Sequence, residues 1–263
     1  MKTKFMLLAA LFMLGCDTDS EEKGGGSQPL QDYVENIDCE LNMKMIAVEG
    51  GLFQMGATSE QGEDARDNES PVHQVQLESF YIAECEVTQA QWKKIMGENR
   101  SEFKDDTHPV EMVNWEDAQK FCRELSALTG KTYQLPTEAQ WEYAARGGKN
   151  SQKYKYSGSD ELDAVAWYKQ NSNAKTNPVK QKRANELGLY DMSGNVWEWC
   201  SDYYGTYDSS KQNNPTGPFS GEDRVLRGGG FFNELQFCRV SHRAGEHPLT
   251  RYNFSGFRVV CLP

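Results

Sequence analysis

Glycine limits the helices that this 263-residue chain can form, because each helical pattern meets a glycine soon after it starts. Three patterns begin at a capping residue and stop at glycine, and they cover Thr88–Gly97, Asn114–Gly130 and Thr137–Gly147. In the third, Gln140 follows Thr137 by three residues and completes a capping box. The sequence therefore predicts three separate helices, with the one after Asn114 the longest.

Apolar segments outside these helices are short and typical of strands. Met45–Val48 and Gly50–Gly56 are expected to form two strands around a glycine turn. Pro71–Tyr81 alternates apolar and polar residues and is predicted to form one half-exposed strand. The chain also has 23 glycines, 6 tryptophans and 12 tyrosines, which favours a core of irregular segments and aromatic clusters. The predicted fold class is α+β with low regular secondary-structure content.

The N-terminal residues are typical of an export signal. Lys2 and Lys4 precede an uncharged stretch over residues 5–15 that is too short to span a bilayer, and Cys16 follows it. The tetrad Met13–Cys16 resembles the lipobox of bacterial lipoproteins. We expect a signal peptide over residues 1–15 and a lipid on Cys16 that attaches the protein to a membrane. The alternative is an ordinary signal peptide with an incidental cysteine.

Residues 16–40 are expected to form a flexible acidic and glycine-rich tether, followed by one domain over residues 41–263. The stretch from Asp17 to about Gln31 has almost no large apolar side chain, so it cannot offset the entropy lost on ordering. The expected location is the cell envelope, at the periplasmic face or the cell surface. Acidic residues after the cysteine favour the surface, whereas Asp17 in second position favours retention at the inner membrane.

The net charge of −11 opposes binding to phosphate backbones, so nucleic acid is not an expected partner. Six cysteines follow Cys16, an even number that in an exported chain indicates disulfides. None of them forms a CxxC pair, which disfavours zinc. His242 and His247 lie five residues apart without carboxylate support, a pattern more typical of structural histidines than of a metal site.

Seven segments resemble the formylglycine-generating-enzyme (sulfatase-modifying factor) family in order and spacing. They are Gly50–Gly56, Glu86–Thr88, His108–Val110, Leu135–Gly148, Asn185–Trp199, Arg227–Gly229 and Gly256–Arg258. This resemblance implies a compact α+β fold related to C-type lectins. The resemblance leaves the activity open. The family contains copper-dependent oxidases that convert a sulfatase cysteine to formylglycine, and it also contains many members without that chemistry.

The family's oxidase site is incomplete in this chain. Catalytic members have a serine after Arg-Gly-Gly, a copper-binding cysteine three residues later and a second cysteine five residues beyond it. Gly230, Asn233 and Cys238 occupy these positions here. Cu(I) prefers thiolates, and Asn233 offers only hard amide atoms. We therefore expect copper not to bind. Cys238 is the single candidate catalytic residue, and a disulfide to Cys200 is a structural alternative for it.

The resemblance also implies a calcium site. The matching ligands are the Asp191 and Glu198 carboxylates and the backbone carbonyls of Gly194 and Val196. Hard oxygen donors on a tight turn suit Ca²⁺. The alternative is a turn in which the two carboxylates accept backbone N–H bonds.

By the same resemblance, the six domain cysteines are expected to form three disulfides. The helix cysteine of related enzymes is linked to the last strand, near the Gly-Phe-Arg motif. The pairs expected here are Cys39 with Cys85, Cys122 with Cys261, and Cys200 with Cys238.

The sequence is compatible with two functions. The first is an envelope lipoprotein that binds a protein, peptide or glycan without oxidase activity. The second is a sulfatase-modifying oxidase using copper and dioxygen, with an altered site. A group of aromatic residues could line a binding cleft or fill the core; these are Tyr203, Tyr204, Tyr207, Phe231 and Phe232.

Overall fold

The computed structural model describes residues 30–263, and the predicted signal peptide and Cys16 lie outside the described residues. The α-helices are α1 (Gln89–Met96), α2 (Trp115–Thr129), α3 (Glu138–Ala145) and α4 (Leu162–Val165). Short 3-10 helices cover Ser59–Asp64, Asp67–Glu69, Gly148–Asn150 and Leu235–Phe237. The strands are β1 (Tyr33–Asn36), β2 (Asn42–Val48), β3 (Leu52–Met55), β4 (His73–Gln76), β5 (Phe80–Ala83), β6 (Tyr133–Gln134), β7 (Trp197–Tyr203), β8 (Gln212–Asn213), β9 (Arg224–Arg227), β10 (Arg243–Glu246), β11 (Ser255–Gly256) and β12 (Val260–Cys261).

The three predicted helices are confirmed, and their start signals act as expected. Thr88, Asn114 and Thr137 each accept a hydrogen bond from the backbone N–H three residues on, and each start is a complete capping box. Gly97 and Gly130 end α1 and α2 in the left-handed conformation. Capping and glycine stops therefore determine where the longer helices lie.

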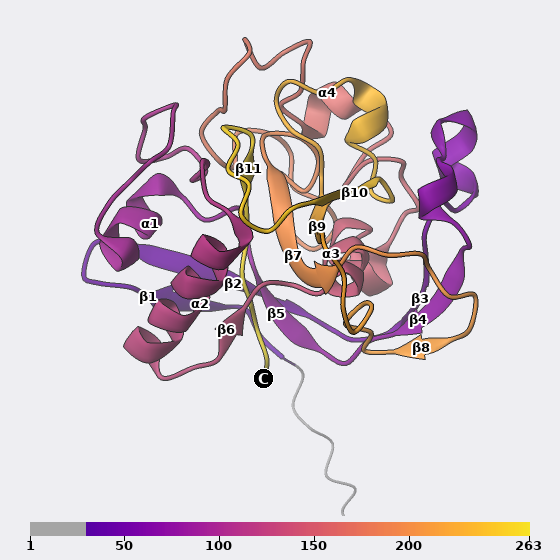
Figure 1. Cartoon of the computed structure of the whole chain (residues 1–263), viewed down its shortest axis with the longest axis horizontal. Helices are drawn as coiled ribbons and strands as arrows, with labels where there is room; N and C mark the ends of the chain where they lie inside the picture. The colour runs from indigo at the N-terminus through magenta and orange to yellow at the C-terminus, as the bar shows by residue number, and fades with distance from the viewer. Residues whose placement is uncertain (1–29) are drawn as a thin grey trace, which may run out of the picture.

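The strands form three separate small sheets. The first has the order β1-β2-β5-β12-β6, the second β10-β9-β7-β11 and the third β3-β4-β8. In Figure 1, α1 and α2 lie beside the five-stranded sheet, while β3, β4 and β8 lie at the opposite end of the molecule. Helix α3 lies between these ends and contacts β3, β7 and β9. The predicted α+β class with short regular elements is confirmed.

The strand predicted over Pro71–Tyr81 is wrong in one respect, because two strands form there and they belong to different sheets. The chain turns between β4 and β5, where the N–H of Leu77 donates to the carbonyl of Gly51 at 3.0 Å. A Cβ atom on Gly50 would lie 2.4 Å from the carbonyl oxygen of Leu77. This close approach of two backbones requires glycine at that position and separates the two strands.

The predicted tether is too long at its C-terminal end. Residues 33–36 form β1, which pairs antiparallel with β2 from Tyr33 opposite Met45 to Asn36 opposite Asn42. Tyr33 packs its ring edge-on against Tyr81 at 4.8 Å and donates or accepts a hydrogen bond with Tyr133. Those aromatic contacts order a segment that we expected to be flexible, so the domain begins before residue 41.

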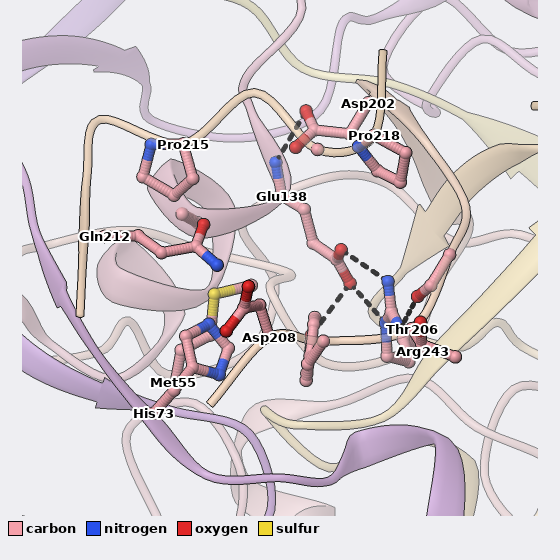
Figure 2. A pocket seen from close by; sticks show the side chains of 14 residues that line it. Met55, His73, Glu138, Asp202, Thr206, Asp208, Gln212, Pro215, Pro218 and Arg243 are labelled. Carbon is pink, nitrogen blue, oxygen red and sulfur yellow. Dashed lines mark hydrogen bonds and ion pairs between the residues drawn. The ribbon is translucent and has the colours of Figure 1, made fainter. Parts of the chain in front are cut away.

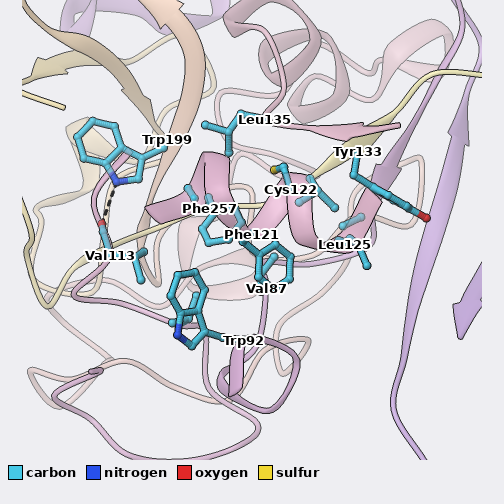
Figure 3. Packing of buried hydrophobic residues seen from close by; sticks show 14 of the residues in the cluster. Val87, Trp92, Val113, Phe121, Cys122, Leu125, Tyr133, Leu135, Trp199 and Phe257 are labelled. Atoms are coloured by element: carbon cyan, nitrogen blue, oxygen red, sulfur yellow. Dashed lines mark hydrogen bonds between the residues drawn. The ribbon is translucent and has the colours of Figure 1, made fainter. Parts of the chain in front are cut away.

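Aromatic rings dominate the core between α1, α2 and the five-stranded sheet, as Figure 3 shows. Trp92 stacks on Phe121 with 5.7 Å between ring centroids, and Phe257 meets the ring of Phe121 edge-on at 5.3 Å. Helix α3 differs from α2, because all eight of its residues are buried. None of the helices formed by residues 30–263 has the length and apolar character that a membrane-spanning segment needs.

Candidate functional site

The turn that matches the family's oxidase site follows β9 directly. Gly228 and Gly229 both have positive φ, at 95° and 74°. A Cβ atom on Gly229 would lie 2.7 Å from the carbonyl oxygen of Phe237 and 3.0 Å from the sulfur of Cys238. The two glycines therefore let the chain fold back so that Gly230, Asn233 and Cys238 come from one compact loop.

Asn233 is held by hydrogen bonds within this loop. Its side-chain oxygen accepts from the indole Nε1 of Trp197 at 2.8 Å and from the N–H of Gly230 at 2.9 Å. The N–H of Asn233 donates back to the carbonyl of Gly230 at 2.9 Å. The amide oxygen is thus fully used in fixing the turn, and its position is set by the first residue of β7.

Cys238 is completely buried in a small cluster with Tyr156, Leu162 and Val165. Burial raises the pKa of its thiol to about 12. The thiol is therefore protonated at neutral pH, and a protonated thiol is neither a good nucleophile nor a good metal ligand. The position that the family uses for its second copper ligand contains a core side chain here.

An aromatic surface surrounds the Asn233 turn. We use this name for Phe103, Phe231, Phe232, Tyr252 and Phe254. Successive rings of this set lie 5.4, 5.7, 4.5 and 4.4 Å apart in the order Phe103, Phe231, Phe232, Phe254 and Tyr252. Phe232 is 40% exposed, Phe231 is buried, and the other three are half-buried.

Sequence reasoning found only part of this surface. Of the five aromatic residues for which a cleft and the core were both possible, Phe231 and Phe232 belong to it. Tyr204 and Tyr207 pack instead against the guanidinium of Arg243, and Tyr203 packs against Arg224. Tyr252 and Phe254 were missed, although two aromatic residues in a polar loop just before the Gly256–Arg258 motif were a usable signal.

Behind the aromatic surface lies a buried polar network. The His242 ring is 5.7 Å from Trp197, and its Nδ1 is 3.2 Å from the carboxylate of Glu69. Glu69 also accepts from Arg239 at 2.5 and 2.8 Å. Burial opposes the charge of Glu69, but hydrogen bonds from His242 and Arg239 lower its pKa to about 2. The pair His242 and His247 is not brought together as a metal site, since His247 is exposed while His242 is buried.

A second tight turn contains Asp191 and Gly194, two of the predicted calcium ligands. Asp191 has a φ of 57°, a left-handed conformation that aspartate tolerates better than most residues. Its Oδ2 accepts from the N–H of Lys180 at 2.8 Å, whereas its buried Oδ1 has no hydrogen-bond partner. Among the described residues, no hydrogen bond reaches the carbonyl oxygens of Gly194 and Val196. Three of the four predicted ligand atoms are therefore free of protein donors.

The fourth predicted ligand, Glu198, is paired with an arginine. Arg258 donates to both carboxylate oxygens of Glu198 at 2.7 Å, and the indole of Trp141 donates to Oε2 at 2.9 Å. Oε1 accepts one bond only and keeps a lone pair. Glu86 is a further buried carboxylate here, and burial together with the charges of Asp191 and Glu198 raises its pKa.

Three carboxylates thus face one arginine around this turn, and burial raises the pKa of Asp191 to about 6. Within residues 30–263 no group of three His, Cys, Asp or Glu side chains is arranged to hold a metal ion, so a calcium ion here would need the backbone carbonyls as well. The donor set fits a hard cation. Calcium at this turn stays a prediction.

The predicted disulfides are absent from the described part of the chain, where all six cysteines are free. Cys200 and Cys238 lie in different core clusters, which explains why they do not pair. Cys122 and Cys261 belong to the same cluster but are separate buried thiols. Cys39 is exposed and Cys85 is half-buried. The cysteines therefore act in this structure as core side chains or surface thiols.

Known proteins share both the sequence pattern and the fold. Residues 32–262 match the family model described as a sulfatase-modifying factor enzyme 1-like domain. The chaperone protein LppX of Paenibacillus barcinonensis is 34% identical over 248 residues, which cover 75% of this chain and 82% of that protein. The formylglycine-generating enzyme of Streptomyces coelicolor is 31% identical over 283 residues, covering 81% of this chain and 87% of the enzyme.

A solved structure agrees with these matches. Treponema denticola variable protein 1 superposes with a TM-score of 0.81 at 31% identity, covering 88% of this chain and 99% of that one. The mixed helix and strand architecture with little regular structure is common to both. This chain belongs to the sulfatase-modifying-factor family, which includes formylglycine-generating enzymes.

Proposed function

We propose that this protein is a ligand-binding member of its family without oxidase activity, attached to the cell envelope by a lipid on Cys16. The observation that carries the proposal is the state of Asn233. An amide stands where the family's oxidases have a copper-binding thiolate, and its oxygen is already used by Trp197 and Gly230. The side chain of Asn233 therefore stabilises the conformation of its own loop.

Copper chemistry is disfavoured by the second position as well. Cu(I) is soft and is held by paired thiolates. Cys238 could supply one thiolate only after losing its proton, and burial raises the pKa of this thiol to about 12. The Gly230 position also lacks the serine hydroxyl of the oxidases.

Ligand binding is supported by the aromatic surface. Half-buried rings present large apolar area with little conformational entropy to lose, which is why aromatic side chains are enriched in recognition sites. Phe232, Phe254 and Tyr252 offer such rings around the Asn233 turn. A protein, peptide or glycan ligand in the envelope fits this chemistry. The name of the relative LppX, a chaperone, favours a protein ligand.

The second candidate function is the sulfatase-modifying oxidase. It is favoured by the 31% identity to the Streptomyces enzyme and by the presence of an unpaired thiol at Cys238. A second thiolate would have to come from outside the turn, because Asn233 cannot supply it.

Oxidase assays separate the two functions. The full chain in detergent, loaded with copper and supplied with dioxygen, should leave the cysteine of a sulfatase-type peptide unchanged. Mass spectrometry of the peptide would register conversion as loss of the thiol and gain of an aldehyde. The Streptomyces enzyme is the positive control. The double variant Gly230→Ser with Asn233→Cys tests whether restoring the family pattern restores copper binding. Turnover by the unmodified chain above a copper-only control would make this protein an enzyme.

Lipid attachment has its own test. Cells grown with a fatty-acid analogue should label the wild-type protein and spare Cys16→Ser, because the analogue can be attached only through the thiol of that cysteine. Equal labelling of both proteins would exclude the anchor and leave an ordinary signal peptide.

We also propose a structural calcium ion at the Asp191 turn, held by Asp191, the carbonyls of Gly194 and Val196, and the free lone pair of Glu198. Support comes from the buried Oδ1 of Asp191, which has no partner, and from the excess of carboxylates over Arg258. Calcium would neutralise that excess and fix the start of β7. Because β7 begins at Trp197, the ion would also steady the aromatic surface.

A further inference from the structure

A cavity of about 220 Å³ lies between α3, the β3–β4 pair and the chain from Asp202 to Pro218. Figure 2 shows its lining, with Asp202 on the side of Pro218 and His73 on the side of Met55. It shares no residue with the aromatic surface or with the Asp191 turn. Thr206 and Asp208 are exposed where it meets solvent.

The positive charge beside this cavity is already paired. Arg243 donates through Nε and Nη2 to the two carboxylate oxygens of Glu138, each at 2.7 Å. Its Nη1 donates to the carbonyls of Gly205 at 2.7 Å and Asn68 at 3.2 Å. All three guanidinium nitrogens are thus engaged within the chain, and four of the five N–H donors are used. The charge of Arg243 is paired with Glu138, which disfavours an anionic ligand.

Two acceptors that line the cavity are unused. Asp202 is 3% exposed; its Oδ2 accepts from the N–H of Glu138 at 3.0 Å and from the hydroxyl of Ser201 at 2.8 Å, whereas no hydrogen bond reaches Oδ1. His73 is 4% exposed, and its Nδ1 lies 3.0 Å from the carbonyl of Pro71. A carbonyl can only accept, so Nδ1 carries the proton and Nε2 is a bare acceptor without a partner.

We propose that this cavity binds a primary ammonium group, with Asp202 as its counter-ion, while His73 lines the opposite side of the cavity (Figure 2). An ammonium presents three N–H donors and one positive charge, which matches acceptors without donors. The walls of Met55, Tyr207 and Pro218 suit the short alkyl chain that such a group carries.

Charge supports the same conclusion. Glu138 pairs with Arg243 and lies 3.6 Å from Arg227, and among the described residues no salt bridge reaches Asp202 or Asp208. Burial, and then repulsion from Glu138, raises the pKa of Asp202 to about 7. A bound cation would remove that cost. A metal ion is a poorer match, since residues 30–263 contain no group of three His, Cys, Asp or Glu side chains placed to hold one.

The test is calorimetric titration of the full chain in detergent with three probes of equal size. n-Butylammonium should bind, whereas butan-1-ol and butyrate should not, because only the first has both the charge and the donors. Nα-acetyl-lysine N-methylamide is a fourth probe that carries the same group on a peptide. Its binding would assign the cavity to a lysine side chain of a partner, and binding of butylammonium alone would assign it to a free amine. Either result supports the proposal.

Variants locate the binding. Asp202→Asn keeps an oxygen for the N–H of Glu138 but removes the charge, and should weaken butylammonium binding about tenfold or more. His73→Phe keeps the packing of the ring against Tyr207, 4.8 Å away, and should weaken it less. Gln212→Trp on β8 should fill the cavity and abolish binding without touching either acceptor.

Asp223→Asn lies outside the cavity and is the matched control, which should bind like the wild type. Melting temperatures establish that each variant is folded. The proposal is overturned if no amine binds, if butan-1-ol binds as tightly as butylammonium, or if folded Asp202→Asn and Gln212→Trp both keep the wild-type affinity.

Discussion

Two tight turns in this molecule differ in how their polar atoms are satisfied. The Asn233 turn follows two glycines, and the side-chain oxygen of Asn233 is paired within the chain. The Asp191 turn contains Gly194, and it leaves the Asp191 Oδ1 and two carbonyl oxygens without protein partners. Since buried polar atoms are nearly always paired, the first turn is complete and the second turn calls for a ligand.

This difference separates a turn that is closed by its own hydrogen bonds from a turn that leaves acceptor atoms without donors. The side chain of Asn233 stabilises the loop that contains it. The Oδ1 of Asp191 has no such hydrogen bond within the described residues. Each prediction below tests one side of this contrast.

The largest effect is expected for Arg258→Met. This change removes the arginine that pairs with Glu198 and leaves three buried carboxylates unpaired, which costs ~3–5 kcal/mol of unfolding free energy. Saturating calcium should recover part of the loss. The matched control is Arg239→Met, which removes an equally buried arginine that pairs with Glu69. Calcium should not change the loss of stability in this variant. Urea unfolding followed by circular dichroism, with calcium and with chelator, measures both. If calcium raises the unfolding free energy of both variants equally, the Asp191 turn is not the part of the protein that responds to calcium.

Removal of calcium from the wild type should have the next largest effect. A ligand present at about 100 times its Kd stabilises the native state by ~2.7 kcal/mol. Chelator should therefore lower the melting temperature, and Asp191→Ala should abolish the response. Elemental analysis of the purified protein gives an independent check. A melting temperature unmoved by chelator, with no metal found, would show that the turn folds without an ion.

Asn233→Ala should cost ~2 kcal/mol, because it leaves the indole N–H of Trp197 and the N–H of Gly230 without an acceptor. Asn253→Ala, which loses one solvent-exposed hydrogen bond to Glu102, is the control and should change stability by less than ~0.5 kcal/mol. Thermal unfolding compares the two. If both variants are as stable as the wild type, the hydrogen bonds to the Asn233 side chain do not stabilise the turn.

The smallest effect on stability is expected for Phe232→Ala, since this ring is 40% exposed and should contribute less than ~0.5 kcal/mol. Its effect on ligand capture should be large if the aromatic surface binds the envelope ligand. Crosslinking in cells, followed by mass spectrometry of the captured partner, compares wild type and variant. Leu249→Ala is a control at an exposed apolar residue outside the aromatic surface.

Local signals in the sequence predicted local structure well. The three N-cap residues, one capping box and the two glycine stops could be predicted directly, because a helix end depends on a few neighbouring residues. The family motifs likewise identified which residues occupy the three positions of the oxidase site, Gly230, Asn233 and Cys238. Both depend on short stretches of chain.

Long-range partners could not be predicted in this way. The pairing of β1 with β2, the division of residues 71–81 between two sheets, and the free state of Cys200 and Cys238 each depend on which segments meet in space. The ammonium cavity is the extreme case. His73 and Asp202 come from β4 and β7, and nothing near either residue in sequence points to the other.

Helix α3 has a consequence for how this domain is made. An eight-residue helix is not stable alone in water, and this one is buried on every side, so it can form only as the three sheets close around it. Glu138 and Glu142, on α3, pair with Arg243 and Arg227 from the C-terminal third of the chain. A nascent chain that has emerged only to residue 200 would therefore hold these carboxylates without their arginines. We expect the domain to acquire its structure in a single late step, after the residues beyond 200 have become available for folding.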